Sequence, residues 1–229
     1  VKKYNKWIWL IGLSPLFLIL LILIIALFSG LPNVEALANP KVNLASTIYS
    51  SDGKIIGSYF KENRFDVKYS EIPQHVIDAL IATEDERFYD HSGVDYQGLF
   101  RAIFSLGADG GGSTLTQQLA KQQFSGKFEN VSKITRAWQK IKEWIIACRI
   151  ERLYTKEEII IHYLNQYDFL NQAVGIKSAA EVYFNTTPDK LTIEQGAMLV
   201  GMLKNSSLFN PLRRAEKVMK RREVVLKQM

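Results

Sequence analysis

The stretch ATEDERFYDHSGVD, residues 82–95, gathers acidic side chains and one histidine directly behind the apolar run VIDALI, residues 76–81. Ser70 and Pro73 are typical of a helix start, so a helix is predicted to run from there through Ile81. The polar side chains at issue are those of Glu84, Asp85, Glu86, Asp90, His91 and Asp95. They form either the solvated end of this helix or the edge of an active site.

Helical phase singles out one carboxylate. If the helix continues, Glu84 shares a face with Ile77, Leu80, Ile81 and Phe88. Burial on an apolar face raises the pKa of a carboxyl group toward the range in which it can exchange a proton near neutrality. Glu84 is therefore a candidate general base.

The alternative is that the helix stops at Thr83 and the acidic cluster faces water. Asp85 and Glu86 point away from the apolar face and are expected to be solvated or to cap a helix. His91 is a lone histidine in a turn, which makes a structural hydrogen bond in most proteins. The local sequence leaves these alternatives open.

An uncharged run at residues 7–28 is long enough, at about 1.5 Å per residue, to cross a bilayer core as a helix. Lysines precede it at positions 2, 3 and 6, and the next basic residue is Lys41. The positive-inside rule then places the N-terminus in the cytoplasm and the chain after Gly30 outside. A signal peptide cleaved near ALA, residues 36–38, is the alternative, but the run exceeds a secretory apolar region.

Composition limits the remaining classes. The net charge of +6 over 229 residues is modest and partly N-terminal, which argues against a nucleic-acid-binding domain. The single cysteine, Cys148, excludes an internal disulfide. The most basic stretch, residues 213–229, is interpreted as a helix with one solvated face.

The predicted organisation has three parts, namely residues 1–30 as cytoplasmic stub and anchor, 31–69 as linker and β-hairpin, and 70–229 as a mainly α-helical domain. The hairpin turns at Asp52-Gly53. Further helices are predicted at residues 96–106, from Thr114, at 131–153, from Thr155, and at 171–184, 192–203 and 215–229, with capping boxes at Thr114–Gln117 and Thr155–Glu158.

The second constellation is GGGSTLTQQLAKQQF, residues 110–124. Glycines before Ser113 and Thr114 at a helix start leave backbone N–H groups free to bind an anion. Lys121 lies two turns further along. One interpretation is a binding site for a phosphate-bearing substrate, and the other is a mobile loop. The segment is not a Walker motif, because no Lys-Ser/Thr pair follows the glycines.

The third constellation is SKITRAWQKIKEW, residues 132–144. Lys133, Arg136 and Lys140 form a cationic stripe on one helix face that ends at Glu143. The stripe is either a solvated face or a pyrophosphate clamp. The histidines lack metal-ligand spacing, so no metal site is predicted.

Taken together, these motifs are similar to those of the family-51 peptidoglycan glycosyltransferases, the transglycosylase domains of class A penicillin-binding proteins and of monofunctional enzymes. The similarity rests on five ordered segments: EDERFYDHSGVD (84–95), GGSTLTQQLAK (111–121), KIKE (140–143), ERLYTKEEIIIHYLN (151–165) and AAEVYF (179–184).

The resemblance implies a lysozyme-like helical lobe with a small membrane-proximal jaw, which polymerises lipid II into β-1,4-linked glycan on the outer face of the cytoplasmic membrane. Undecaprenyl pyrophosphate is released. The implied partners are lipid II, the growing glycan strand, the membrane and other cell-wall synthesis proteins. No cofactor is required by the resemblance, and no ligand motif supports a divalent cation at the pyrophosphate.

By the same resemblance, Glu84 is the general base and Glu143 the second essential carboxylate. Lys140 stabilises the leaving group, and Ser113 and Lys121 belong to the donor site. Residues with supporting roles are Asp85, Phe88, His91, Asp95, Thr114, Gln117 and Gln118.

The chain departs from the family at Gln139, where an arginine is usual, and Arg136 is expected to take part of its role. The final segment resembles the approach to a transpeptidase domain, so a longer bifunctional protein is expected. Two rival hypotheses are a lysozyme-like lytic glycosidase and a non-catalytic anchored module that binds glycan or a partner.

Overall fold

The computed structural model describes residues 13, 14, 17, 18, 21, 22, 24–38, 46–52, 55–59, 66–104, 112–124 and 132–229. Half of the predicted membrane-spanning stretch, residues 7–28, lies outside these ranges. Among the described residues, no helix has the length and apolar character needed to cross a membrane.

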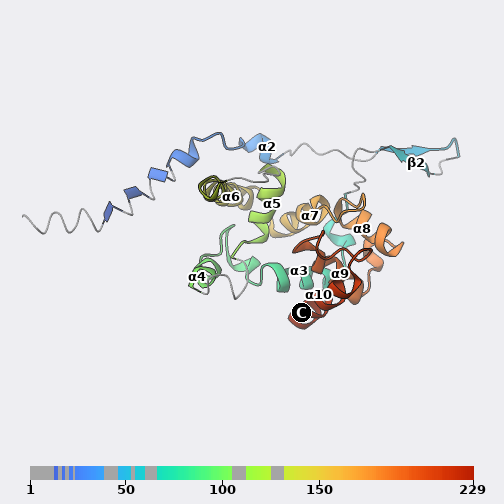
Figure 1. The fold of residues 1–229 in the computed structure, drawn as a ribbon. Helices are drawn as coiled ribbons and strands as arrows, with labels where there is room; N and C mark the ends of the chain where they lie inside the picture. Colours follow the sequence, from blue (N-terminus) through green and yellow to red (C-terminus); the bar gives the residue numbers. More distant parts are fainter. Residues whose placement is uncertain are drawn as a thin grey trace, which may run out of the picture.

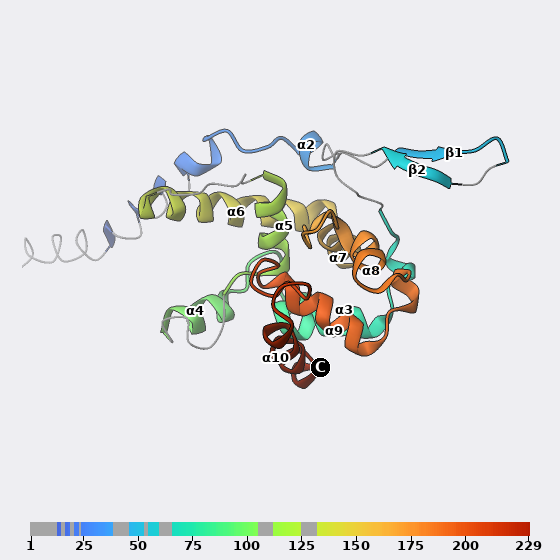
Figure 2. The ribbon, with the colours of Figure 1, turned by 45° about the vertical axis from the view of Figure 1, so that its right-hand side comes forward.

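The described part of the chain is mainly helical (Figures 1 and 2). Its helices are α2 (Val34–Ala38), α3 (Gln74–Glu84), α4 (Tyr96–Phe104), α5 (Leu115–Phe124), α6 (Lys133–Leu153), α7 (Lys156–Gln166), α8 (Gly175–Phe184), α9 (Ile193–Leu203) and α10 (Ala215–Gln228). Strands β1 (Ser46–Tyr49) and β2 (Ile55–Tyr59) pair antiparallel, with an irregularity in register between Ile48 and Tyr49. This small sheet lies to one side of the helices (Figure 2).

One group of helices consists of α3, α9 and α10, which lie side by side in both ribbon views (Figures 1 and 2). Val76 and Leu80 of α3 are completely buried. Gly196 lets α9 approach α3 closely, since a Cβ atom there would come within 2.8 Å of Val76 Cγ2. Helix α10 buries Val218 and Val225 against this pair. An apolar stripe on each helix therefore fixes the group.

The second group of helices is α5, α6 and α7, with α5 packed against both of the others. Leu115, Leu119 and Ala120 of α5 are buried. The predicted capping box at the start of α7 is confirmed, because Thr155 Oγ1 accepts from the Glu158 N–H while the Glu158 carboxylate accepts from the Thr155 N–H.

Helix α6 also holds the N-terminal part of the described chain. Two of its side chains, and that of Tyr154 directly after it, donate to backbone carbonyls of residues 29–37, a segment that contains α2 and that was predicted as linker from residue 31 on. The pairs are Lys142 Nζ to Ser29 O (2.9 Å), Arg149 Nη1 to Pro32 O (3.1 Å) and Tyr154 Oη to Leu37 O (2.8 Å). This segment therefore lies along α6.

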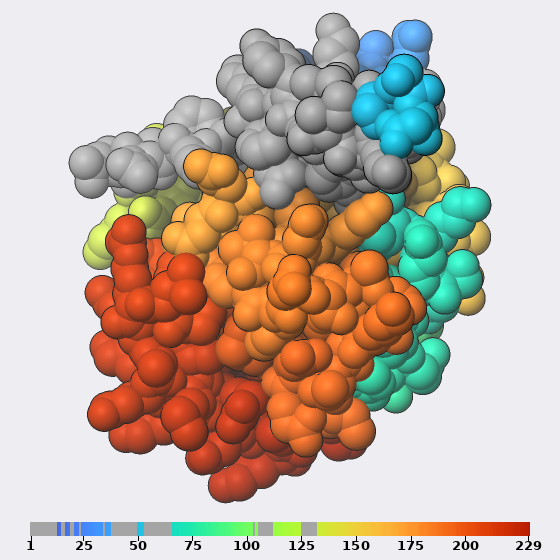
Figure 3. Space-filling model, turned by 90° about the vertical axis from the view of Figure 1, so that its right-hand side faces the viewer, coloured from blue at the N-terminus to red at the C-terminus, as the bar shows by residue number. Residues whose placement is uncertain are grey.

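Two predicted helix boundaries were wrong. Helix α3 extends beyond Ile81 to Glu84, and the backbone leaves the helix at Asp85. Helix α8 begins at Gly175 rather than at residue 171, because residues 170–172 all have positive φ angles of 51° to 66°. Such a left-handed run cannot belong to a right-handed helix. In Figure 3 the α8 region (orange) lies between the C-terminal part (red) and the segment leading into α3 (teal).

Candidate active site

A cavity of about 460 Å³ opens between the C-terminal end of α3, the start of α5, the residue after α9, and α10. Glu84 and Gln118 lie in its wall, together with Ser113 and Thr114 from the start of α5. Basic side chains of the lining are Arg87, Arg101, Lys204 and Arg221. The structure thus brings the first two predicted motifs to one cavity with a cationic wall.

Glu84 is the last residue of α3 and is nearly buried, with 12% of its side chain exposed. Its Oε2 atom accepts a hydrogen bond from Gln118 Nε2 at 3.1 Å. Its Oε1 atom forms an ion pair with Arg221 Nη2 at 3.6 Å. Both oxygens are therefore held, one from α5 and one from α10.

The surroundings of Glu84 have opposing effects on its ionisation. Burial raises the pKa of the carboxyl group, and Asp85 adds to this effect, while Gln118, Arg221 and Lys204 lower it. The net result is a raised pKa. A raised pKa is what a carboxylate needs to take up a proton near neutrality, so the prediction from helical phase has a physical counterpart here.

Gln118 is itself oriented by a buried tyrosine. Tyr163 Oη donates to Gln118 Oε1 at 3.0 Å, and this leaves the Gln118 Nε2 group to donate to Glu84. Tyr163 is completely buried, and burial raises its pKa well above the usual value, so it remains a neutral donor. The pairing fixes which end of the Gln118 amide faces the carboxylate.

A second polar cluster joins α6 to the start of α5. Lys140 Nζ donates to Ser113 Oγ at 2.8 Å and to Glu143 Oε2 at 3.2 Å. Glu143 is 6% exposed, so its charge is balanced by Lys140 rather than by water. Because Ser113 also lines the cavity, it connects this pair to the wall that contains Glu84.

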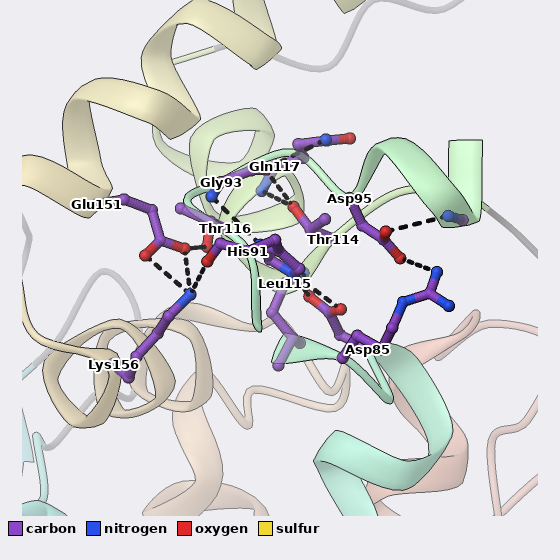
Figure 4. A network of polar contacts seen from close by, with 12 residues as sticks. Asp85, His91, Gly93, Asp95, Thr114, Leu115, Thr116, Gln117, Glu151 and Lys156 are labelled. Atoms are coloured by element: carbon purple, nitrogen blue, oxygen red, sulfur yellow. Dashed lines mark hydrogen bonds and ion pairs between the residues drawn. The ribbon is translucent and has the colours of Figure 1, made fainter. Parts of the chain in front are cut away.

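The loop after α3 is anchored by Asp85 (Figure 4). Asp85 is buried, and its Oδ2 atom accepts from the Leu115 N–H at 2.8 Å, at the first residue of α5. The His91 Nδ1 atom accepts from the Gly93 N–H at 3.2 Å, so His91 Nε2 donates to Asp85 Oδ1 at 3.0 Å. Asp85 and His91 therefore hold the loop against the start of α5.

Gly93 is the point where this loop meets α5 and α6 (Figure 4). Thr114 Oγ1 and Gln117 Nε2 both donate to Gly93 O, at 2.7 and 3.2 Å. Gln117 therefore uses its side chain here, while its backbone N–H donates to Thr114 Oγ1. A side chain at position 93 would meet the Ala147 backbone of α6 at 2.8 Å, so only glycine fits.

Phe88 also helps to hold the loop after α3 in place. It is completely buried in a 3₁₀ turn, and Lys156 Nζ lies 4.3 Å from its ring centroid. Lys156 Nζ also donates to His91 O and to Glu151 Oε1 (Figure 4). Thr116 Oγ1 of α5 donates to the same Glu151 oxygen, so one network joins α5, α6 and α7 to the loop.

Asp95 starts α4 at the far side of the cavity. Its Oδ1 atom accepts from the Gly98 N–H at 3.0 Å and its Oδ2 atom from Arg87 Nη2 at 2.5 Å. Burial opposes ionisation of Asp95, but the hydrogen bonds from Arg87 and Gly98 outweigh it and lower the pKa. Asp95 thus remains ionised and holds α4 against the cavity.

Three of the four residues predicted for the donor site, and Glu143, are absent from the described lining of the cavity, and Lys140 is connected to it only through Ser113. Lys121 on α5 and Arg136 on α6 are both exposed, and neither lines the cavity. Glu86, expected to be solvated, is exposed at the rim of the cavity. Among the described residues, no three His, Cys, Asp or Glu side chains are grouped so that they could hold a metal ion.

Three basic residues of the cavity lining were not predicted from the sequence. Arg101 lies on α4, Lys204 directly follows α9, and Arg221 lies on α10. The only signal was the apolar spacing of Val218 and Val225, which shows that α10 packs on one side. It does not show that Arg221 reaches Glu84, which is far away in sequence.

The chain is similar in sequence to known proteins. The family model described as Transglycosylase matches residues 52–229. Penicillin-binding protein 1A of Escherichia coli (strain K12) is 42% identical over 203 residues, or 87% of this chain and 23% of that protein. Penicillin-binding protein 1A of Aquifex aeolicus (strain VF5) is 36% identical over 218 residues, or 93% of this chain and 29% of that protein.

Among solved structures, Penicillin-Binding Protein 1A from Haemophilus influenzae aligns with a TM-score of 0.40 and 23% identity, over 82% of this chain and 18% of that chain. The chain spans about a quarter of the length of the curated relatives that it matches.

Proposed function

Because the chain belongs to the Transglycosylase family, we propose that it is a peptidoglycan glycosyltransferase that polymerises lipid II, with Glu84 as its general base. The observation that carries the proposal is the position of Glu84, a nearly buried carboxylate of raised pKa in a cavity with a cationic wall. A glycosidase would need no such wall, since no pyrophosphate leaves during hydrolysis.

In the proposed step, the 4-hydroxyl oxygen of the acceptor N-acetylglucosamine attacks C1 of the donor N-acetylmuramic acid. Glu84 accepts the hydroxyl proton as the new C–O bond forms. The bond from C1 to the pyrophosphate oxygen breaks, and undecaprenyl pyrophosphate leaves with the electron pair. Attack from the face opposite the leaving group inverts the anomeric centre.

The leaving group carries negative charge away, so cations rather than a second general acid can assist its departure. Lys140 and Ser113 are proposed to bind it, with Glu143 orienting Lys140. The contacts of Lys140 with both residues support this assignment. Lys121 and Arg136 retain a proposed donor-site role, which requires their exposed side chains to meet a long lipid-linked substrate.

No cofactor is proposed. The proposed site of action is the outer face of the cytoplasmic membrane, with the run at residues 7–28 as a single-pass anchor and the N-terminus inside. A lipid-linked substrate supports this placement. The relatives are about four times as long as this chain, which agrees with a native protein that continues into further domains. Other cell-wall synthesis proteins are proposed partners.

The test is incubation of the purified chain in detergent with lipid II, followed by separation of glycan products. The native chain and the exposed-site control Glu157→Gln are expected to form polymer. Glu84→Gln is expected to lower the rate by about 10²- to 10⁴-fold, the usual contribution of a general base. If the native chain and Glu84→Gln formed polymer at equal rates, Glu84 would not be the general base. Shortening of preformed glycan would favour the glycosidase.

A further inference from the structure

Arg221 is unusual among the cavity cations because it contacts the reacting carboxylate itself. Its Nη2 atom lies 3.6 Å from Glu84 Oε1, and both side chains are 12% exposed. Gln118 occupies the other carboxylate oxygen. The proposed reaction leaves Arg221 without a role.

We propose that Arg221 is a positioning residue, which orients the Glu84 carboxylate from α10 and balances its negative charge in the cavity wall. The proposal rests on the assignment of Glu84 as the general base. With Gln118 on Oε2 and Arg221 on Oε1, the carboxylate plane is fixed by groups from two helices. An incoming hydroxyl group then meets an oriented acceptor, which is how pre-organised sites gain rate.

The way in which α10 is docked supports this role. Val218 and Val225 lie on either side of Arg221 and are buried, so the helix cannot roll without exposing them. Gly201 of α9 faces the Arg221 side chain, and a Cβ atom there would lie 3.1 Å from Arg221 Cγ. Because Gly201 has no side chain, there is room for the Arg221 side chain to extend toward Glu84.

Other charged and titratable groups also face Glu84. Lys204, after α9, lowers the Glu84 pKa as Arg221 does but with a smaller effect, and Asp85 raises it. Tyr163 of α7 and Tyr167, the residue directly after that helix, lie close enough to be influenced by the Glu84 charge. Both tyrosines have raised pKa values and stay neutral, so Arg221 and Lys204 are the cations that set the balance.

The decisive measurement is the titration of Glu84 in the full chain, by NMR of ¹³C-labelled glutamate side chains. Glu84→Gln assigns the signal, because one resonance disappears. Arg221→Gln is expected to move the Glu84 midpoint to higher pH by roughly one unit or more. Lys204→Gln is expected to move it less, and the exposed neighbour Lys220→Gln not at all. Arg221→Lys, which keeps the positive charge, is expected to leave the Glu84 midpoint close to that of the native chain.

The kinetic counterpart is polymerisation of lipid II as a function of pH. The acid limb of kcat/KM is expected to move upward in Arg221→Gln, because the base must be ionised. At pH values below the new midpoint kcat falls about tenfold for each unit of displacement, with little change in KM. A uniform loss at every pH, with an unchanged Glu84 midpoint, would mean that Arg221 only stabilises the fold and would overturn the proposal.

The two proposals fail separately. If the native chain forms no polymer, the proposed function fails, yet the titration still decides whether Arg221 sets the state of Glu84. If polymer forms and the midpoint does not respond to Arg221→Gln, the function stands and the role of Arg221 is refuted.

Discussion

At Glu84, burial acts against ionisation while hydrogen bonding and nearby cations favour it. Burial dominates, so the pKa of the folded protein lies above the ordinary value of 4.5. A carboxyl group of this kind stabilises the fold below its unfolded pKa, and this contribution is lost as pH rises through the folded pKa. The residue is therefore a source of instability at neutral pH, one that the proposed role of general base requires.

This balance predicts that Glu84→Gln, which cannot ionise, has a higher thermal midpoint than the native chain at about pH 7.5. The difference is expected to vanish at about pH 4, where Glu84 is protonated. Circular dichroism melting curves at both pH values test this. A lower midpoint for the variant at neutral pH would show that the Arg221 ion pair outweighs the cost of burial.

Asp85 is expected to matter for stability rather than for proton transfer. It accepts from His91 and from the first N–H group of α5, and it is buried. Asp85→Asn removes the charge that favours a helix N-terminus and replaces one acceptor by a donor. The expected loss in the free energy of unfolding is about 1–3 kcal/mol. Urea unfolding measures it, with the exposed Asp90→Asn as a control that should stay near native.

At the scale of elements, Gly93 joins the loop after α3 to α6. It has φ +93°, and any Cβ atom would lie 2.8 Å from the Ala147 carbonyl carbon. Gly93→Ala thus combines backbone strain with a clash, and a loss of more than about 2 kcal/mol is expected in urea unfolding.

Gly30→Ala separates the two effects in that prediction. Gly30 also has positive φ, at +71°, but no atom lies within 4 Å of the Cβ position. It is expected to show the backbone cost alone, about 1 kcal/mol. Equal losses at both positions would mean that the contact with α6 adds nothing.

The elements also show what the sequence can and cannot predict. Caps are local, so the chemistry of Thr155 and Glu158 was predicted correctly and determines where α7 begins. The start of α8 was placed too early, because left-handed residues 170–172 carry no glycine to signal the break. Helical phase identified Glu84 because one helix contains both the carboxylate and its apolar neighbours.

The positions of Lys204 and Arg221 in the cavity lining could not be predicted, because only helix packing brings them there. Arg221 was interpreted as part of a solvated basic face, although its side chain is 12% exposed. Periodicity tells which side of α10 is apolar, but not that this side packs on α3 and α9. Lys204 follows α9 in a loop, where no periodicity exists to guide a prediction.

At the scale of the whole molecule, the cavity is enclosed by segments from the middle and the end of the chain. Residues 82–87 form one wall, residues 112–114 another, and Lys204, Arg221 and Gln228 close the third. No local segment can form this site alone. Its integrity depends on α10 remaining docked on α3 and α9.

Val225 and Val224 provide a matched test of this dependence, since they are neighbours on α10 with opposite environments. Val225 is completely buried and Val224 is 43% exposed. Val225→Ala leaves a cavity beneath α10 and should cost about 1–3 kcal/mol in urea unfolding. Val224→Ala should change stability by less than about 0.5 kcal/mol.

The same pair connects packing to activity. If α10 carries Arg221 to Glu84, loosening the helix should raise hydrogen exchange of the α10 amides in Val225→Ala before the remaining helices open. Lipid II polymerisation should then decline with temperature earlier in Val225→Ala than in Val224→Ala, while the two rates agree in the cold. Helix α10 packs into the apolar core through Val225 and, among the described residues, supplies the cation that pairs with the Glu84 carboxylate. If Val225→Ala frees α10 yet leaves the temperature profile of polymerisation unchanged, α10 does not complete the site.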